Sequence, residues 1–185
     1  MLPPVRPAPT ELVSEVLLHS LDTSWDALRL RLEGLTDTEY LWEPAPGCWT
    51  VRLGADGTAV ADWADADPEP APVTTMAWRM WHIGVDCLDS YSSRLFDTTG
   101  SGLSGRDWVM DAGDAGRRME QAWTSFRTGV ATWGEEGLLL ALGPNWGPYA
   151  NHSNLDLALH AQREVVHHGA EIALLRDLYA ATSAS

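Results

Sequence analysis

Apolar residues recur at helical spacing in four stretches of this 185-residue chain. In the first, residues 11–32, they repeat every three to four positions, which is the period of a helix with one buried face. Thr10 would cap the start of this helix, and Gly34 would end it. The same spacing predicts helices over residues 75–96 and 114–133, and from Ser153 or Asn154 to about residue 181. Four helices with few strands predict an all-α fold, an antiparallel four-helix bundle.

Two long connections join these predicted helices. Residues 35–73 could hold a helical turn at 37–41, and then two short extended pieces around Asp56-Gly57, a dipeptide typical of a β-hairpin. Residues 142–154 are rich in glycine, proline, asparagine and aromatic residues. Connections longer than about 12–15 residues are often functional. We expect both to lie at the ends of the bundle, where pockets form.

Charge and composition exclude some classes of partner. The formal net charge is -14, with 26 acidic residues against 12 basic ones, all arginine. Nucleic acids and anionic membranes require basic patches, so we expect neither as a partner. No apolar run approaches the roughly 20 residues that cross a bilayer. We therefore expect a cytoplasmic protein with a flexible leader at residues 1–9 and a single domain at residues 10–182.

The two cysteines, Cys48 and Cys87, lie far apart in the sequence and form no CxxC motif. Disulfides are rare in a reducing compartment, so we expect two free thiols. Cys87 falls in the second predicted helix, where a buried cysteine is usually inert.

The fourth predicted helix contains the stretch HAQREVVHHGAE at residues 160–171. His160, Glu164 and His168 are spaced by four and share one stripe of the helix. The apolar positions place Glu164 and His168 toward the core, whereas His167 lies nearer the edge of that face. Two interpretations stay open. The stripe could stabilise the helix through carboxylate–imidazole pairs, or Glu164 and His168 could bind one metal ion from the same face.

A metal site would need a further ligand from another helix. His82 lies on the apolar stripe of the second predicted helix, one turn after Trp78. His82, Glu164 and His168 would form a site of two histidines and one carboxylate, which leaves coordination positions open. Asp86 would be a further ligand or would orient an imidazole, although an exposed carboxylate is an equal alternative.

With these residues in view, nearly the whole chain resembles the DinB-like superfamily, also called the YfiT-like metalloenzymes. The most specific pieces are WHIG at residues 81–84 and VVHHGAEI at 165–172, and DGTAVADW and LGPNWGPYA are similar to an actinobacterial-type branch. The resemblance implies a four-helix bundle in up-down-down-up order. It also implies a divalent metal, Zn, Ni, Fe or Mn, held by three histidines. Two of these correspond to His82 and His168, but the third position is Glu164.

The resemblance also suggests an activity. Some members are similar to mycothiol-dependent maleylpyruvate isomerase or to thiol S-transferases, so we expect an S-transferase or isomerase that uses a low-molecular-weight, mycothiol-type thiol. Metal coordination would lower the pKa of that thiol. The alternatives are a metal-dependent hydrolase with Glu164 as its base, and a bundle that binds a small ligand without catalysis. A homodimer would fit any of them.

The same resemblance guides where a small-molecule substrate would bind. We expect it to enter from the loop side, past four aromatic residues: Trp42, Trp49, Trp146 and Tyr149. Trp78 and His160 would lie next to the ligands. Arg79 or Arg163 would meet a carboxylate of the thiol or substrate, and the alternative is that both are solvated on the helix surface.

Overall fold

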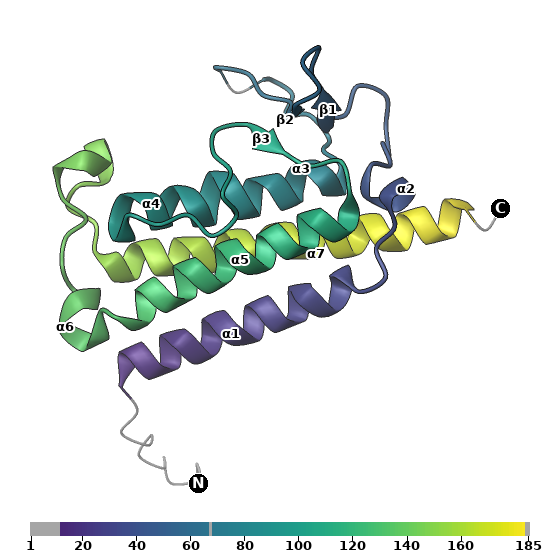
Figure 1. The fold of residues 1–185 in the computed structure, drawn as a ribbon. Helices are drawn as coiled ribbons and strands as arrows, with labels where there is room; N and C mark the ends of the chain where they lie inside the picture. The colour runs from purple at the N-terminus through teal and green to yellow at the C-terminus, as the bar shows by residue number, and fades with distance from the viewer. Residues whose placement is uncertain (1–11, 67, 184–185) are drawn as a thin grey trace, which may run out of the picture.

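The computed structural model describes residues 12–66 and 68–183, and the chain is mostly helical with one small sheet (Figure 1). The helical elements are α1 (Val13–Leu32), α2 (Asp37–Tyr40), α3 (Met76–Trp81), η1 (His82–Asp89), α4 (Ser90–Phe96), α5 (Ala112–Ala131), α6 (Gly134–Leu138), η2 (Pro144–Tyr149) and α7 (Asn154–Ser183). The strands are β1 (Val51–Leu53), β2 (Ala59–Ala61) and β3 (Asp107–Trp108).

The four helical stretches predicted from the sequence are all present. Helix α5 begins two residues earlier than predicted because the Asp111 side chain caps it by accepting a hydrogen bond from the Asp114 backbone N–H. At the start of α7, Ser153 and Asp156 cap the helix by bonding to each other's backbone N–H groups. Thr10 and the predicted leader lie outside the described residues, so they stay predictions.

The second predicted helix is one continuous run made of α3, η1 and α4. Thr75 caps its start through a bond from the Trp78 backbone N–H. Its middle part, η1, has the wider turn of a π-helix, a form that is rare and frequently found at functional sites. Nearly all of η1 is buried, so its side chains face several neighbours instead of one.

The first long connection contains the predicted hairpin. Strands β1 and β2 pair antiparallel on either side of Asp56-Gly57, with Arg52 opposite Val60. Strand β3 extends this hairpin to a three-stranded sheet in the order β1-β2-β3. A strand of two residues has too short a pattern to be seen in the sequence, and the same is true of the short helices α6 and η2.

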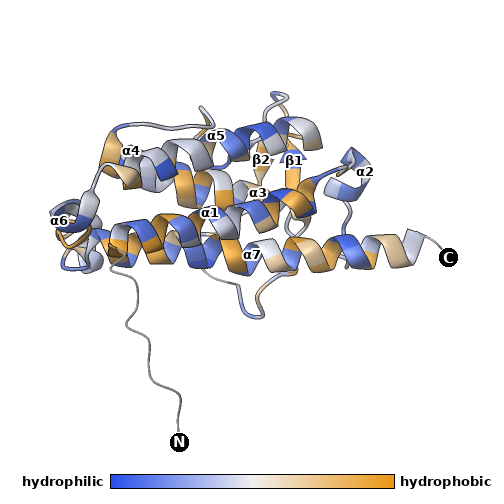
Figure 2. Cartoon of the chain, turned by 90° about the horizontal axis from the view of Figure 1, so that it is seen from below, coloured by the Kyte–Doolittle hydropathy of each residue, from blue (hydrophilic) through white to orange (hydrophobic). Residues whose placement is uncertain are grey.

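The core lies between α1, α5, α7 and the α3–η1–α4 run, whose apolar faces meet, and Figure 2 shows apolar and polar positions alternating around the helices. Trp25 of α1 stacks on Trp123 of α5 with ring centroids 4.9 Å apart. Phe126 and Leu21 are fully buried beside this pair. Two of the ten tryptophans therefore serve to pack α1 against α5.

The last turns of α7 extend past the end of α1, toward α2 (Figures 1 and 2). There, the Arg176 guanidinium of α7 binds both carboxylate oxygens of Glu39 in α2, at 2.6 and 3.1 Å. Arg176 also donates to the backbone carbonyls of Arg31 and Glu33, which end α1. One side chain thus joins three elements at this end of the molecule.

Two further expectations can be compared with the structure. Cys48 and Cys87 are both free, as predicted, and both are buried. Within the described residues, no helix combines the length and the apolar character that crossing a bilayer requires.

Candidate metal centre and adjoining cavity

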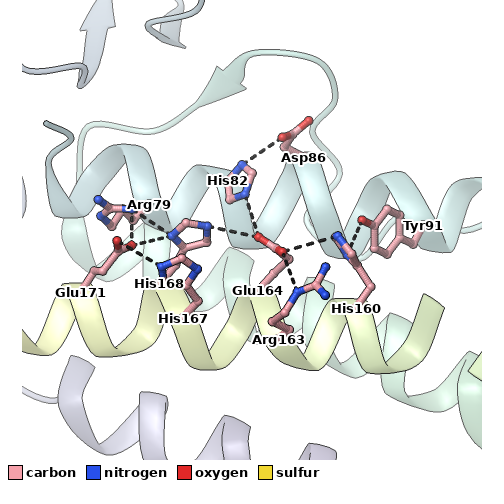
Figure 3. Close-up of polar contacts among 10 residues, drawn as sticks. All are labelled: Arg79, His82, Asp86, Tyr91, His160, Arg163, Glu164, His167, His168 and Glu171. Atoms are coloured by element: carbon pink, nitrogen blue, oxygen red, sulfur yellow. Dashed lines mark hydrogen bonds and ion pairs between the residues drawn. The ribbon is translucent and has the colours of Figure 1, made fainter. Parts of the chain in front are cut away.

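The structure brings His82, Glu164 and His168 together where η1 lies beside α7 (Figure 3). Glu164 Oε2 lies 3.4 Å from His82 Nε2 and 3.2 Å from His168 Nε2. The three side chains are 21%, 16% and 13% exposed, so they are largely shielded but can still be reached from outside. The three residues predicted as metal ligands therefore form one cluster.

The local sequence explains this geometry. Residues spaced by four on α7 share a face, and the same face buries Val165 and Ile172 against the core. Glu164 and His168 are therefore held at the edge of the core. His82 begins the wide turn of η1 and stacks on Trp78, with ring centroids 5.2 Å apart and planes at 8°. That stacking fixes the plane of the His82 imidazole.

Each imidazole of the cluster has a second carboxylate behind it. His82 Nδ1 lies 3.0 Å from Asp86 Oδ2, and His168 Nδ1 lies 2.6 Å from Glu171 Oε2. Arg79 ion-pairs with Glu171 and also places Nη1 2.9 Å from His168 Nδ1. The shorter contact, to the carboxylate, makes Nδ1 the protonated nitrogen of His168. In His168, Nε2 then carries a lone pair toward Glu164.

On its other side, Glu164 contacts His160 and Arg163. His160 Nε2 lies 3.5 Å from Glu164 Oε1, and Arg163 Nε lies 3.9 Å from the same oxygen. The Tyr91 hydroxyl lies 3.0 Å from His160 Nδ1. His160 is thus a neighbour of the cluster, as predicted, and its ring leads from Glu164 toward Tyr91 (Figure 3).

The surroundings of the cluster shift the pKa values of its two histidines in opposite directions. Burial lowers the pKa of His82, but the carboxylates of Asp86 and Glu164 outweigh it, and the net shift is upward. Burial also lowers the pKa of His168, and Glu171 does not compensate, so that pKa stays below its ordinary value. Burial raises the pKa of Glu164, but the hydrogen bond and charges of the histidines outweigh it and lower the pKa overall. The protonated form of His82 is therefore favoured beside an ionised Glu164, whereas the neutral form of His168 is favoured.

The donor set fits a divalent ion such as zinc. Two imidazole nitrogens and one carboxylate oxygen lie within 4.8 Å of one another. Tetrahedral zinc with bonds of about 2.0–2.1 Å has ligand atoms about 3.3 Å apart. The two distances to Glu164 Oε2, 3.2 and 3.4 Å, agree with this spacing. Carboxylates behind both imidazoles complete the arrangement that metal-binding histidines usually have.

A cavity of about 910 Å³ adjoins the cluster. Asp86 and His160 belong both to its wall and to the surroundings of the cluster. The other residues of the wall come from α4, from the connection that contains η2, and from α7: Ser90, Tyr91, Arg94, Leu142, Trp146, Gly147, Pro148, Tyr149, His152, Asp156, Leu157 and Arg163.

The aromatic wall of the cavity was predicted in part. Trp146 and Tyr149 line it, as expected from the second connection. The prediction was wrong for Trp42 and Trp49, which lie in the first connection. Trp49 packs against Trp78 on the sheet side, and Trp42 packs against the last turns of α7. The two connections lie at opposite ends of the long helices (Figure 1), so they cannot share one pocket.

Sequence reasoning also missed the roles of several residues. Arg79 does not face the cavity, because it is bound to Glu171 beside His168. Glu171 itself follows His168 by three residues, and that helical spacing could have identified it. Tyr91 and Arg94 carried no signal, because only the packing of α4 on η2 and α7 turns them toward the cavity.

Comparison with known proteins agrees with this arrangement. The family model described as DinB superfamily matches residues 20–172, which include all three residues of the cluster. No curated protein matches the chain, and no solved structure matches it.

Proposed function

Because the chain belongs to the DinB superfamily, we propose that it is a metal-dependent enzyme whose divalent ion is held by His82, Glu164 and His168. The orientation of the two imidazoles carries this proposal. Each turns Nε2 toward Glu164 and presents Nδ1 to another carboxylate. Histidines that serve only to stabilise a helix have no reason to adopt this orientation twice, whereas metal ligands usually adopt it.

Glu164 is better placed as a ligand than as a general base. Its Oε2 atom lies at almost equal distances from the two Nε2 atoms, inside the group of donors. A base that activated water would instead lie beside the ligands and face the cavity. This geometry favours transfer or isomerisation over the hydrolase alternative in which Glu164 is the base.

The proposed reaction is the transfer or isomerisation of a small molecule with the help of a low-molecular-weight thiol. When bound, the ion would lower the pKa of a coordinated thiol and make it a nucleophile. Cys48 and Cys87 are both buried, and burial raises the pKa of Cys87 well above its ordinary value. The thiol would therefore come from outside the chain. A cavity of about 910 Å³ is large enough for a thiol together with its electrophile.

We also infer that the helices form the up-down-down-up bundle typical of the family. Two pairs of contacts support this order. Gln162 of α7 reaches Ser20 and Ser24 of α1, and further along both helices Asp177 pairs with Arg31, so α1 and α7 run in the same direction. His82 meets Glu164, whereas the later residue Tyr91 meets the earlier residue His160, so the second helix runs against α7.

The first test is the metal content of tag-free protein by elemental mass spectrometry. We expect about one equivalent of a divalent metal in the wild type, lost in Glu164→Ala and in His168→Ala. His19→Ala is the matched control, because His19 is an exposed histidine on α1. Wild-type protein that takes up no zinc, nickel or manganese at neutral pH would refute the metal site and favour the role of a ligand-binding bundle.

The second test separates the reaction classes in metal-loaded protein. Cysteine-containing small thiols are assayed with a chloronitroarene electrophile, beside an aryl ester without any thiol. Turnover that requires both the thiol and the metal would support transfer. Ester cleavage without a thiol would support the hydrolase instead.

A further inference from the structure

Arg94, in the last turn of α4, lies at the wall of the cavity over the indole of Trp146. Its guanidinium carbon is 5.0 Å from the centre of that ring. The ring is almost fully buried beneath it, and Tyr91 packs beside the ring at 5.8 Å. This cation–π contact holds the plane of the guanidinium and leaves its N–H donors free to bind.

Arg94 has no acidic partner, which is unusual in this chain. Among residues 12–66 and 68–183, each arginine except Arg94 and Arg106 lies within 4.0 Å of a carboxylate: Arg29, Arg31, Arg52, Arg79, Arg117, Arg118, Arg127, Arg163 and Arg176. The Arg94 side chain makes no hydrogen bond within the described residues either. A protein with a net charge of -14 offers many acids, so an unpaired arginine at a cavity indicates that the anion is supplied by a ligand.

The acids that share the cavity are already engaged. Asp86 lies against His82, and Asp156 accepts bonds from the backbone N–H and hydroxyl of Ser153 at the start of α7. Those bonds lower the pKa of Asp156, so it stays ionised and bound in its cap. Arg163, the other arginine of the wall, leans toward Glu164. Arg94 is therefore the available cationic group of the cavity.

We propose that Arg94 anchors an organic anion, a small molecule with a carboxylate at one end. Its guanidinium fork matches a carboxylate in two parallel hydrogen bonds, and Trp146 and Tyr149 would contact an apolar or ring-shaped middle portion. Arg94 follows His82 by twelve residues, at most about 18 Å along the helix, and its side chain leans back toward the helix start. The His82 side chain leans the same way, so the carboxylate would lie on the order of 10–18 Å from the His82 imidazole.

The role of the far end of this ligand rests on the proposed function, because it would lie at the His82/Glu164/His168 cluster. The anchor itself does not rest on that function, since Arg94 contacts no residue of the cluster. The substrate class is thus a carboxylate whose reactive group is separated from the acid by on the order of 10–18 Å.

The test uses chelator-treated, metal-free protein, so that a carboxylate cannot bind an ion at the cluster. Calorimetry compares 4-phenylbutyrate with the neutral 4-phenylbutyramide, which has the same shape. We expect the carboxylate to bind the wild type at least about tenfold more tightly than the amide. Arg94→Gln should abolish this preference, and Arg94→Lys should retain part of it. Arg106→Gln is the matched control, because Arg106 also lacks an acidic partner but does not line the cavity.

Each of these measurements tests whether Arg94 binds the carboxylate. Equal affinities for the two probes, no binding of either, or equal losses in the Arg94 and Arg106 variants would overturn it. Thermal unfolding checks that each variant is folded. If Arg94→Gln does not fold, the carboxylate preference of Arg94→Lys is compared with that of the wild type instead. Metal content is measured separately. Metal uptake without a carboxylate preference would support the proposed metal site and refute the role of Arg94. A carboxylate preference without metal uptake would support the role of Arg94 and refute the metal site.

Discussion

Replacing Arg176 by methionine should destabilise the protein strongly, because it leaves the Glu39 carboxylate buried without its partner. The two side chains are only 19% and 9% exposed, so solvent screens their interaction little. The substitution removes two charge-assisted hydrogen bonds to Glu39 and keeps most of the side-chain volume. Losing one partner of a buried ion pair typically costs about 3–5 kcal/mol.

The expected loss in the free energy of unfolding at pH 7 is therefore about 3–5 kcal/mol. For a chain of this size, this corresponds to a fall in Tm of roughly 6–20 °C.

Denaturant unfolding at pH 7 measures this loss. Arg29→Met is the matched control, because its pair with Asp26 is at the surface and should contribute less than about 0.5 kcal/mol. The double variant Arg176→Met with Glu39→Leu should recover most of the loss, since replacing both partners by apolar groups is often neutral. A loss below about 1 kcal/mol for Arg176→Met would refute the reasoning.

Three further outcomes are expected. Gly116 and Gly129 lie on the same helix, and thermal unfolding should separate their alanine variants. Gly116→Ala should stabilise the protein by about 0.5–1 kcal/mol, because the new Cβ meets open space. Gly129→Ala should destabilise it by about 1–3 kcal/mol, because the new Cβ would lie 2.3 Å from an aromatic ring. Asp86→Asn and Glu171→Gln should each weaken zinc binding about 10–100-fold in a competition with a chromophoric chelator, and unchanged affinity in both would contradict their orienting role. In metal-free protein, NMR should show that the pKa of His82 lies above 6.5. Zinc binding should therefore weaken as the pH falls through that raised pKa, because a protonated imidazole cannot bind the ion. A titration midpoint of His82 below pH 6.5 would contradict the effect of Asp86 and Glu164 on this pKa.

The sequence predicted the long helices and the cluster for the same physical reason. Helical periodicity fixes which residues share a face, so the spacing of Glu164 and His168 was sufficient to place both on the buried side of α7. The position of His82 on the apolar stripe of the second predicted helix identified it as their partner, the family resemblance agreed, and the structure places its Nε2 3.4 Å from Glu164. The metal ion itself and the reaction stay predictions.

Other features depend on contacts between segments that are distant in the sequence. Periodicity does not show at which end of a bundle a connection lies, so Trp49 was assigned to the wrong pocket. The pairing of Arg79 with Glu171, across two helices, was not visible in either helix alone. A single sequence also gives no direct sign of a π-helical turn such as η1.

The wide turn of η1 sets the angular phase between the two halves of its helix. His82 begins the turn and faces Glu164, whereas Tyr91 and Arg94 follow it and face the cavity. If the same residues adopted ordinary α-helical geometry, everything after η1 would rotate by about 100°, because a π-helical turn holds about one residue more than an α-helical turn. The cluster would keep His82, but the cavity would lose its wall. A family member without this turn would therefore need different residues in its pocket, even with the same ligands.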